Sequence, residues 1–283
     1  MERFKAYALV AAIAAPANLA AQEQFKELDT PYVPTPQVVV NRMLELAKVK
    51  PGETVIDLGS GDGRIMITAA QEYGARGFGV EIDPYLVQSS NEEAQRVGVA
   101  DRIKFLKQDL FTTDFHEADV LTLYLMPDVN MALRPKILAE LRPGTRVVSH
   151  DYGMGVWRPD VQETVPAPDK TVGVRKESTL YLWVVPAKVA GAWDLEIRLG
   201  KKARRYPLAL EQHYQRVSGS VTGAGKKDAA VEGRVNGEEF RLELPRGVIS
   251  REPVELVGRA EDDMLKGTVR RKSREIATWS ARR

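Results

Sequence analysis

The chain of 283 residues contains no cysteine, which excludes disulfide bonds, thiolate metal sites and cysteine nucleophiles. Its three histidines, His116, His150 and His213, are too widely spaced for a metal-ligand pattern, so we expect no metal. The net charge is only +2, which gives no global argument for a nucleic-acid partner. The apolar run from Tyr7 to Ala15 is too short to span a bilayer comfortably.

That apolar run nevertheless has the layout of a targeting segment. Arg3 and Lys5 precede it, and Pro16 and a small-residue stretch ending in Ala20-Ala21-Gln22 follow it. The alternative is an ordinary Ala-rich helix. We expect residues 1–21 to be a signal peptide or a membrane anchor, which would place the protein at a membrane or export it, for example to the periplasm.

The most informative stretch is Val55-Ile56-Asp57-Leu58-Gly59-Ser60-Gly61-Asp62-Gly63-Arg64. A β-branched run ends in an acid, three glycines follow at alternate positions, and a helical pattern begins. Glycine has no Cβ, so such a turn lets the backbone approach a ligand closely. The free N–H groups of the following helix point at the same spot. A second strand-like run ends in Glu81, at a spacing from Asp57 typical of acids that bind ribose hydroxyls in dinucleotide folds.

This combination resembles the class I, seven-strand methyltransferases that use S-adenosylmethionine. The sequence DLGSGDG fits their pattern better than the GxGxxG of nicotinamide enzymes. The resemblance implies that the glycine turn holds the methionine part of the cofactor, that Glu81 binds the ribose, and that Asp109 lies by the adenine. The cofactor residues expected on this basis are Asp57, Gly59, Ser60, Gly61, Gly63, Glu81 and Asp109.

Strand and helix patterns alternate along the first two thirds of the chain, which predicts an α/β fold with a parallel sheet covered on both faces. Strands are expected at 54–58, 76–82, 103–107, 119–125 and 145–150, with helices near 62–73, 84–97 and 129–140. Thr35 is expected to cap an earlier helix that begins at Pro36. Two runs near 161–166 and 178–185 have no helix between them and suit the antiparallel hairpin of a seven-strand sheet. The methyltransferase domain is therefore expected over 30–187.

The pattern changes after Gly191 to short runs of period two, punctuated by glycines and by the hairpin signal Asn236-Gly237. This predicts an all-β domain over 191–283, with six to eight antiparallel strands in a small barrel or sandwich. The segment carries 20 Lys and Arg against 14 Asp and Glu. Because both signs are interspersed, a solvated β surface is favoured over a nucleic-acid site.

A narrower resemblance involves the proline-rich segment PYVPTP, GVEIDP, and the segment LMPDVN followed by LRPKILAELRPGTRVVSHDY. Together they resemble the protein-lysine methyltransferases related to the mitochondrial enzymes for the ATP synthase c-subunit and the adenine nucleotide translocase, and small archaeal lysine methyltransferases. This resemblance covers roughly Thr30 to Val185 and implies a lysine acceptor in a protein, which could be a membrane protein. The (Asn/Asp)-Pro-Pro-(Tyr/Phe) box of adenine and amide methyltransferases is absent after strand 119–125, which argues against amide-type acceptors.

We place three residues around the acceptor amine, namely Tyr32, Tyr124 and Asp128. Tyr124 equally suits a core position, and Asp128 equally suits a helix N-cap. The pair His150-Asp151 could serve as a base, although a structural histidine is favoured there. Two alternatives remain: a methyltransferase of the same fold acting on a lipid or quinone-type molecule, and an exported, non-catalytic binding protein. We expect no nucleic-acid partner, and membrane association through the N-terminus.

Overall fold

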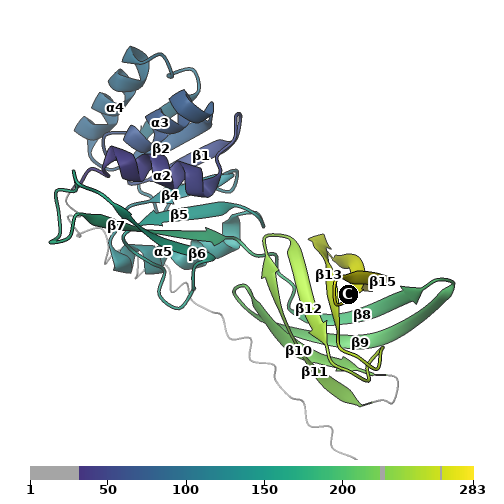
Figure 1. Cartoon of the computed structure of the whole chain (residues 1–283). Helices are drawn as coiled ribbons and strands as arrows, with labels where there is room; N and C mark the ends of the chain where they lie inside the picture. The colour runs from purple at the N-terminus through teal and green to yellow at the C-terminus, as the bar shows by residue number, and fades with distance from the viewer. Residues whose placement is uncertain (1–31, 224–226, 262) are drawn as a thin grey trace, which may run out of the picture. The chain divides into compact units, whose positions relative to one another are not determined.

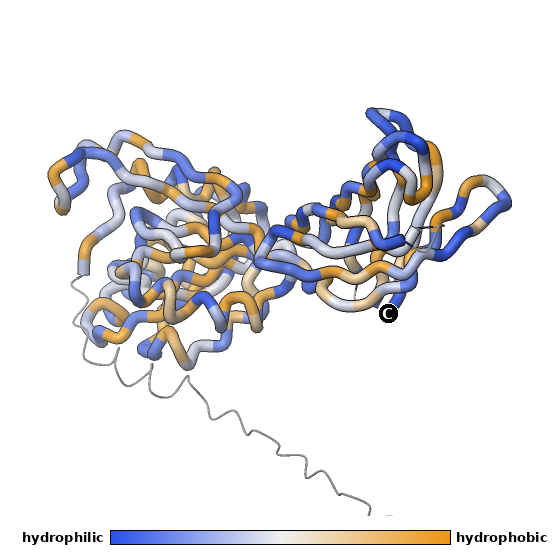
Figure 2. The backbone as a smooth tube through the Cα atoms, turned by 90° about the horizontal axis from the view of Figure 1, so that it is seen from below, coloured by the Kyte–Doolittle hydropathy of each residue, from blue (hydrophilic) through white to orange (hydrophobic). Residues whose placement is uncertain are grey.

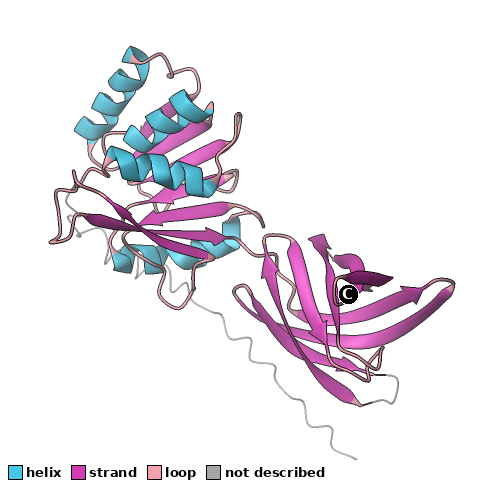
Figure 3. Cartoon of the chain, in the orientation of Figure 1, coloured by secondary structure: helices cyan, strands magenta, loops and turns pink. Residues whose placement is uncertain are grey.

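The computed structural model describes residues 32–223, 227–261 and 263–283 (Figure 1). The expected targeting segment, residues 1–21, lies outside the described residues. None of the helices within the described ranges is long and apolar enough to cross a membrane. The described chain contains one mixed sheet with helices and one closed barrel of strands, as Figure 3 shows by colour.

Helices and strands alternate in the α/β domain, as the sequence predicts. The elements in chain order are α2 (Gln37–Ala47), β1 (Thr54–Leu58), α3 (Arg64–Tyr73), β2 (Arg76–Glu81), α4 (Pro84–Arg96), β3 (Ile103–Lys107), β4 (Val120–Leu123), α5 (Pro127–Glu140), β5 (Arg146–His150), β6 (Val161–Pro166) and β7 (Glu177–Val184). Only β4 is clearly shorter than its expected range of 119–125, because the chain leaves the sheet at Tyr124 to enter α5.

The sheet order is β3-β2-β1-β4-β5-β7-β6. Strands β1 to β5 are parallel, and β7 inserts antiparallel between β5 and β6. This confirms the expected seven-strand sheet with its closing hairpin. The order reverses between β1 and β4, and ligands of open α/β sheets bind beyond the carboxyl ends of the strands at such a point.

Helix α2 forms because its apolar residues recur at helical spacing and bury one face. Val39, Val40, Met43, Leu44 and Ala47 are buried in a core shared with α3, α4 and one face of the sheet. The expectation that Thr35 caps this helix is wrong. Pro36 occupies the N-cap position, and the buried Thr35 hydroxyl instead hydrogen-bonds His150 Nδ1 at 3.2 Å.

The second domain is a closed antiparallel barrel, which settles the expected choice between barrel and sandwich. Its strands are β8 (Gly191–Leu199), β9 (Lys202–His213), β10 (Arg216–Thr222), β11 (Asp228–Asn236), β12 (Glu239–Leu244), β13 (Val254–Glu261), β14 (Met264–Arg271) and β15 (Arg274–Arg282). Each strand alternates between interior and solvent, and Figure 2 shows the same alternation of apolar and polar residues along the backbone.

Two paired glycines allow the barrel wall to bend tightly. Gly258 and Gly267 face one another across β13 and β14. A Cβ at Gly258 would lie 2.0 Å from the Lys266 carbonyl oxygen, and a Cβ at Gly267 would lie 2.0 Å from that of Val257. A side chain at either position would therefore push the strands apart, as expected at a strongly curved point of a small barrel.

Candidate active site

The glycine turn between β1 and α3 lies at the reversal point of the sheet. Gly59, Gly61 and Gly63 all have positive φ angles of 76°, 53° and 80°. The N–H groups of Gly59 and Ser60 both donate to the Val80 carbonyl at 2.9 Å, which ties the turn to the end of β2. L-residues with a side chain adopt this conformation only at a cost, so the glycine spacing read from the sequence is required by the backbone.

Glu81 ends β2 beside that turn. Its Oε2 accepts a hydrogen bond from the Gly61 N–H at 3.0 Å, and its Oε1 accepts from Ile82 N at 2.8 Å and Asp83 N at 3.1 Å. Residues 20 positions apart in the sequence, Gly61 and Glu81, are thus in direct contact. The structure therefore brings together the two features on which the cofactor prediction depends.

Asp57 and Ser60 have unpartnered buried oxygens at the same place. Asp57 Oδ1 accepts from the Thr122 hydroxyl at 2.7 Å, whereas Asp57 Oδ2 and Ser60 Oγ have no hydrogen-bond partner within the described part of the chain. Burial raises the pKa of the Asp57 carboxyl to about 7. Buried polar atoms are normally satisfied. Two that are not, beside a glycine turn, fit a ligand with hydrogen-bond donors such as the amino acid part of S-adenosylmethionine.

Asp109 follows β3 at the same edge of the sheet and is half-buried. Its Oδ1 accepts from the Phe111 N–H at 2.8 Å, and its carbonyl accepts from the Thr112 and Thr113 hydroxyls. These local bonds fix the turn after β3. The side chain is held at the edge where the other expected cofactor residues lie.

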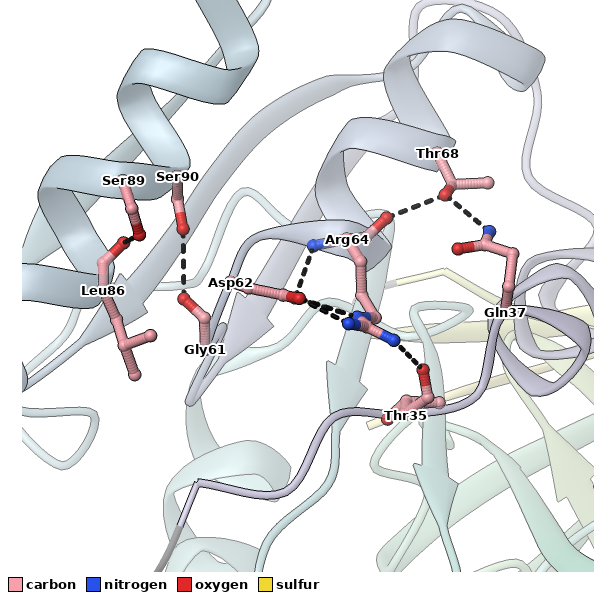
Figure 4. A network of polar contacts seen from close by, with 9 residues as sticks. All are labelled: Thr35, Gln37, Gly61, Asp62, Arg64, Thr68, Leu86, Ser89 and Ser90. Atoms are coloured by element: carbon pink, nitrogen blue, oxygen red, sulfur yellow. Dashed lines mark hydrogen bonds and ion pairs between the residues drawn. The ribbon is translucent and has the colours of Figure 1, made fainter. Parts of the chain in front are cut away.

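The proline-rich segment before α2 is fastened to the glycine turn through the Arg64 side chain, which also pairs with Asp62, as Figure 4 shows. Arg64 Nε donates to both carboxylate oxygens of Asp62, at 2.9 and 3.0 Å, and Arg64 Nη1 donates to the Thr35 carbonyl at 2.8 Å. Burial, followed by the nearby Asp62 carboxylate, raises the pKa of Tyr32 to about 12. The Tyr32 ring lies so close to Gly61 that a Cβ there would be 2.6 Å from Tyr32 Cε2. Tyr32 thus covers the glycine turn.

Tyr124 lies at the end of β4 in an aromatic stack. Its ring centroid is 3.9 Å from that of His150 and 6.3 Å from that of Tyr152. The phenol is half-buried, and burial, followed by the negative charge of Asp151, raises its pKa. The Asp151 carboxylate near its hydroxyl is itself paired with Lys170 Nζ at 2.6 Å. The ring of Tyr124 is therefore held by aromatic stacking beside a largely buried ion pair.

His150 has a structural position. Its Nε2 lies 2.7 Å from the Ser178 hydroxyl and its Nδ1 faces Thr35, so both ring nitrogens are engaged. Burial lowers the pKa of His150 to about 4, which keeps the imidazole neutral near pH 7. These contacts favour the structural interpretation over a catalytic base.

Asp128 is exposed at the second position of α5, and the N-cap position is Met126, so Asp128 does not cap the helix. Within the described residues its carboxylate has no hydrogen bond or ion pair.

Asn130, two residues further along α5, was not predicted from the sequence as part of the site. Asn130 is fully buried and its Nδ2 donates to Ser149 Oγ at 3.2 Å and to the Tyr152 carbonyl at 3.1 Å. Asn130 therefore fixes the loop that carries Tyr152. From the sequence, its position next to Val129 on the buried face of α5 is the one sign that its side chain would be buried.

Asp151 and Lys170 were also missed as a pair. Asp151 has a positive φ of 61°, rare for a residue with a side chain, and its backbone and carboxylate both bond Thr179. Lys170 Nζ additionally donates to the Glu177 carbonyl at 2.7 Å. Nothing in the linear spacing connects these residues, because the β5–β6 and β6–β7 connections bring them together only in the folded sheet.

The fold and the site define a methyltransferase of the seven-strand class, with S-adenosylmethionine as methyl donor. The family described as the ANTKMT methyltransferase domain matches residues 57–161. A protein-lysine N-methyltransferase of Saccharolobus islandicus is 42% identical over 156 residues, which cover 55% of this chain and 93% of that protein. The chain belongs to this family of methyltransferases.

Two further relatives match this chain over a smaller share of their own length. The mouse adenine nucleotide translocase lysine N-methyltransferase is 35% identical over 133 residues, or 47% of this chain and 57% of that protein. The Xenopus laevis lysine N-methyltransferase named for the ATP synthase c-subunit is 33% identical over 154 residues, or 54% of this chain and 64% of that protein. This chain thus spans less than two thirds of each.

A solved structure resembles the α/β domain with S-adenosyl-L-homocysteine bound. It is described as an RNA methyltransferase from Salinibacter ruber, is 50% identical, and has a TM-score of 0.50. The similarity covers 56% of this chain and 96% of that one. The solved structure therefore supports S-adenosylmethionine as the methyl donor, and the named acceptors differ between it and the curated relatives.

Proposed function

We propose that this protein transfers a methyl group from S-adenosylmethionine to the ε-amine of a lysine in a protein acceptor. The observation that carries the proposal is the 42% identity to a protein-lysine N-methyltransferase across 93% of that protein. The geometry at the carboxyl edge of the sheet supports it, because aromatic rings and carboxylates lie around the end of β4, where an acceptor would approach the glycine turn.

The reaction is an in-line displacement. The lysine nitrogen forms a bond to the methyl carbon while the carbon–sulfur bond breaks, and S-adenosylhomocysteine leaves. The amine must be neutral to attack, so a proton must first leave the ammonium group. Most of the rate enhancement then comes from positioning the lone pair toward the methyl carbon.

Tyr32, Tyr124 and Asp128 are assigned to the acceptor. An aromatic wall suits both the aliphatic stem of lysine and a methylated ammonium group, through packing and cation–π attraction. The stacking of Tyr124 on His150 keeps its ring in one orientation. The exposed Asp128 carboxylate is free to accept a hydrogen bond from the amine and orient its lone pair.

The assignment of these side chains is tested by conservative substitution. Tyr124→Phe and Asp128→Asn should each lower turnover about ten- to hundredfold while leaving affinity for S-adenosylhomocysteine nearly unchanged. Asp101→Asn is a matched control, because Asp101 is exposed and lies on the α4–β3 connection away from these residues. Equal turnover in all three variants would reject the assignment.

RNA is a second candidate acceptor, favoured by the 50% identity to the Salinibacter protein, which is described as an RNA methyltransferase. Radiolabelled methyl groups from S-adenosylmethionine, added with the purified enzyme to a cell extract, distinguish the possibilities. We expect label that protease releases and ribonuclease does not. Label removed by ribonuclease would identify RNA, label only in lipid or small molecules would identify a small-molecule enzyme, and no label would favour a non-catalytic binding protein.

The membrane is proposed as the working location, with a membrane protein as acceptor. The support is the sequence of residues 1–21, in which Arg3 and Lys5 precede a short apolar run. A reporter fused after Gln22 should partition to the membrane or be exported. A reporter that stays wholly in the cytosol would refute this location, and the intact mass of the mature protein would separate a cleaved signal from an anchor.

A further inference from the structure

Alternate connections of the barrel gather at one rim. The closed order β10-β11-β12-β13-β14-β15-β8-β9 is antiparallel throughout, so the turns β8–β9, β10–β11, β12–β13 and β14–β15 lie at the same end. The pairing of Thr278 with Arg198 places the β14–β15 turn next to the β8–β9 turn. We call this end the basic rim, defined as the described residues of these four turns, without residues 224–226, together with the strand residue on either side of each turn. The opposite rim is defined in the same way by the other three turns.

The basic rim is strongly cationic. Its first two connections carry exposed Lys201, Lys202 and Lys227. Its last two carry exposed Arg246, Arg251, Arg271, Lys272 and Arg274. Against these eight cations stand two acids, Asp228 and Glu252, among the described residues.

The cations of the basic rim are almost all unpaired, whereas several charges near the opposite rim are paired, although Arg216 of that rim has no ion pair within the described residues. Within the described residues only Arg271 of the eight has an ion pair, a loose one at 3.7 Å to Glu252. At the other end Lys266 pairs with Glu261, Arg259 with Glu238, and Arg283 with Asp263. Gln215 and Asn236 of that opposite rim also hydrogen-bond Asp160 of the α/β domain. The basic rim therefore presents free positive charge.

We propose that the basic rim binds the surface of an anionic phospholipid membrane. A ring of turns presents its cations to a plane, which suits a lipid surface. Leu199 lies between them at the tip of β8 with 63% of its surface exposed, beside Lys201 and Lys202. An apolar side chain flanked by lysines is able to enter the headgroup region while the lysines contact phosphates. The four turns contain no aromatic residue, so they lack the stacking platforms of single-strand nucleic-acid sites.

The test measures the partition of the full chain onto vesicles of phosphatidylcholine alone or with about 30% phosphatidylglycerol. Each cation near an anionic surface contributes about fivefold to the partition coefficient, so replacing Lys201, Lys202 and Lys272 together by Gln should weaken binding about a hundredfold. The matched control replaces Lys48, Lys50 and Lys104 by Gln. These lysines are exposed on the α/β domain, and Lys48 and Lys272 share a positive φ, of 52° and 56°.

We expect the wild-type protein and the control triple variant to bind anionic vesicles tightly and neutral vesicles weakly. Binding of both proteins to anionic vesicles should weaken as salt rises from about 0.1 M to about 0.5 M. Leu199→Ser should also weaken binding to anionic vesicles relative to wild type, without changing the salt dependence of binding. All variants should keep the wild-type circular dichroism spectrum, which shows that the barrel is folded, and wild-type affinity for S-adenosylhomocysteine, which separates this proposal from that for methyl transfer.

Three outcomes would overturn the proposal: equal partition of wild type onto neutral and anionic vesicles, a Lys201/Lys202/Lys272 variant that binds like wild type, or an equal loss in the control triple. Fluorescence anisotropy with a labelled RNA provides the remaining comparison. A loss of RNA binding as large as, or larger than, the loss of vesicle binding would identify a nucleic-acid surface or a general polyanion surface, and would also overturn the assignment to lipid.

Discussion

Two buried ionisable groups should make the stability of the α/β domain depend on pH in opposite directions. Asp57 has its pKa raised by burial from 3.8 to about 7, and His150 has its pKa lowered by burial from 6.5 to about 4. Both side chains are essentially inaccessible to solvent, with 1% and 0% exposed. Their shifts therefore act on the free energy of unfolding with little solvent screening.

The signs follow from which state binds more protons. Folded Asp57 keeps a proton that the unfolded chain releases, so its contribution is present below pH 4 and lost as pH rises to about 7. His150 stays neutral in the folded state at pH values where it is protonated in the unfolded chain. Its contribution to the free energy of unfolding is therefore present above pH 6.5 and lost as pH falls to about 4. At 1.36 kcal/mol per pKa unit, the two contributions are about 4 and about 3 kcal/mol. Between pH 4 and 6.5 they nearly cancel.

Single substitutions should reveal the pH dependence that each group gives to the free energy of unfolding. Asp57→Asn keeps the acceptor for the Thr122 hydroxyl, and His150→Gln keeps polar contacts with Thr35 and Ser178. Relative to wild type, Asp57→Asn should lose stability as pH falls from 6.5 to 4, and His150→Gln should lose stability as pH rises across the same range. The double variant should again be nearly flat.

Urea unfolding followed by circular dichroism at 222 nm measures this, because every helix among the described residues belongs to the α/β domain. His213→Gln is the control, because His213 is exposed on the barrel and lies outside the domain whose unfolding is followed. Parallel curves for wild type, Asp57→Asn and His150→Gln would refute the assignment of opposed shifts.

Three other predictions concern the cofactor and the domains. Glu81→Ala should weaken S-adenosylhomocysteine binding by about 1–3 kcal/mol in calorimetry, because two ribose donors lose their acceptor; unchanged affinity would reject its placement on the ribose. Gly61→Ala should abolish binding, whereas Gly98→Ala, which shares a positive φ of 73° but has open space around it, should bind normally; equal binding by both would make the glycine turn structural. Residues 190–283 expressed alone should give a folded β-rich domain, since the barrel encloses most of its own core and loses from it only Ala187 and Val189, together with contacts such as those of Gln215 and Asn236 with Asp160; a disordered fragment would contradict this.

The fold was predictable because local patterns agree with the final topology. The β-branched run before Asp57, the acid at Glu81 and the glycine turns each indicate the same α/β plan, and period-two alternation identified the barrel strands. Thr35 shows the limit of that reasoning. A threonine before Pro36 has the pattern of a helix cap. Its hydroxyl instead hydrogen-bonds His150, which lies 115 residues later in the sequence.

The arrangement of the candidate site was predictable where it depends on sequence spacing and not where it depends on long-range packing. Gly61 and Glu81 were identified from spacing, and the structure places them in contact. The role of Asn130 in holding Tyr152, and the pairing of Asp151 with Lys170, depend on connections between strands that a linear sequence does not display. These residues surround the ring of Tyr124, and their roles become visible only when the tertiary fold is known.

The closure of the barrel also has a consequence for synthesis of the chain. Its first strand, β8, pairs with its last, β15, so Arg198 finds its partner Thr278 only when nearly the whole chain has been made. The α/β sheet is already complete at Val184 and can fold while the barrel is still emerging from the ribosome. Until β15 arrives, β8 and β14 present unpaired edges to other nascent chains. A truncation that removes β15 alone should therefore leave a folded catalytic half attached to an aggregating tail.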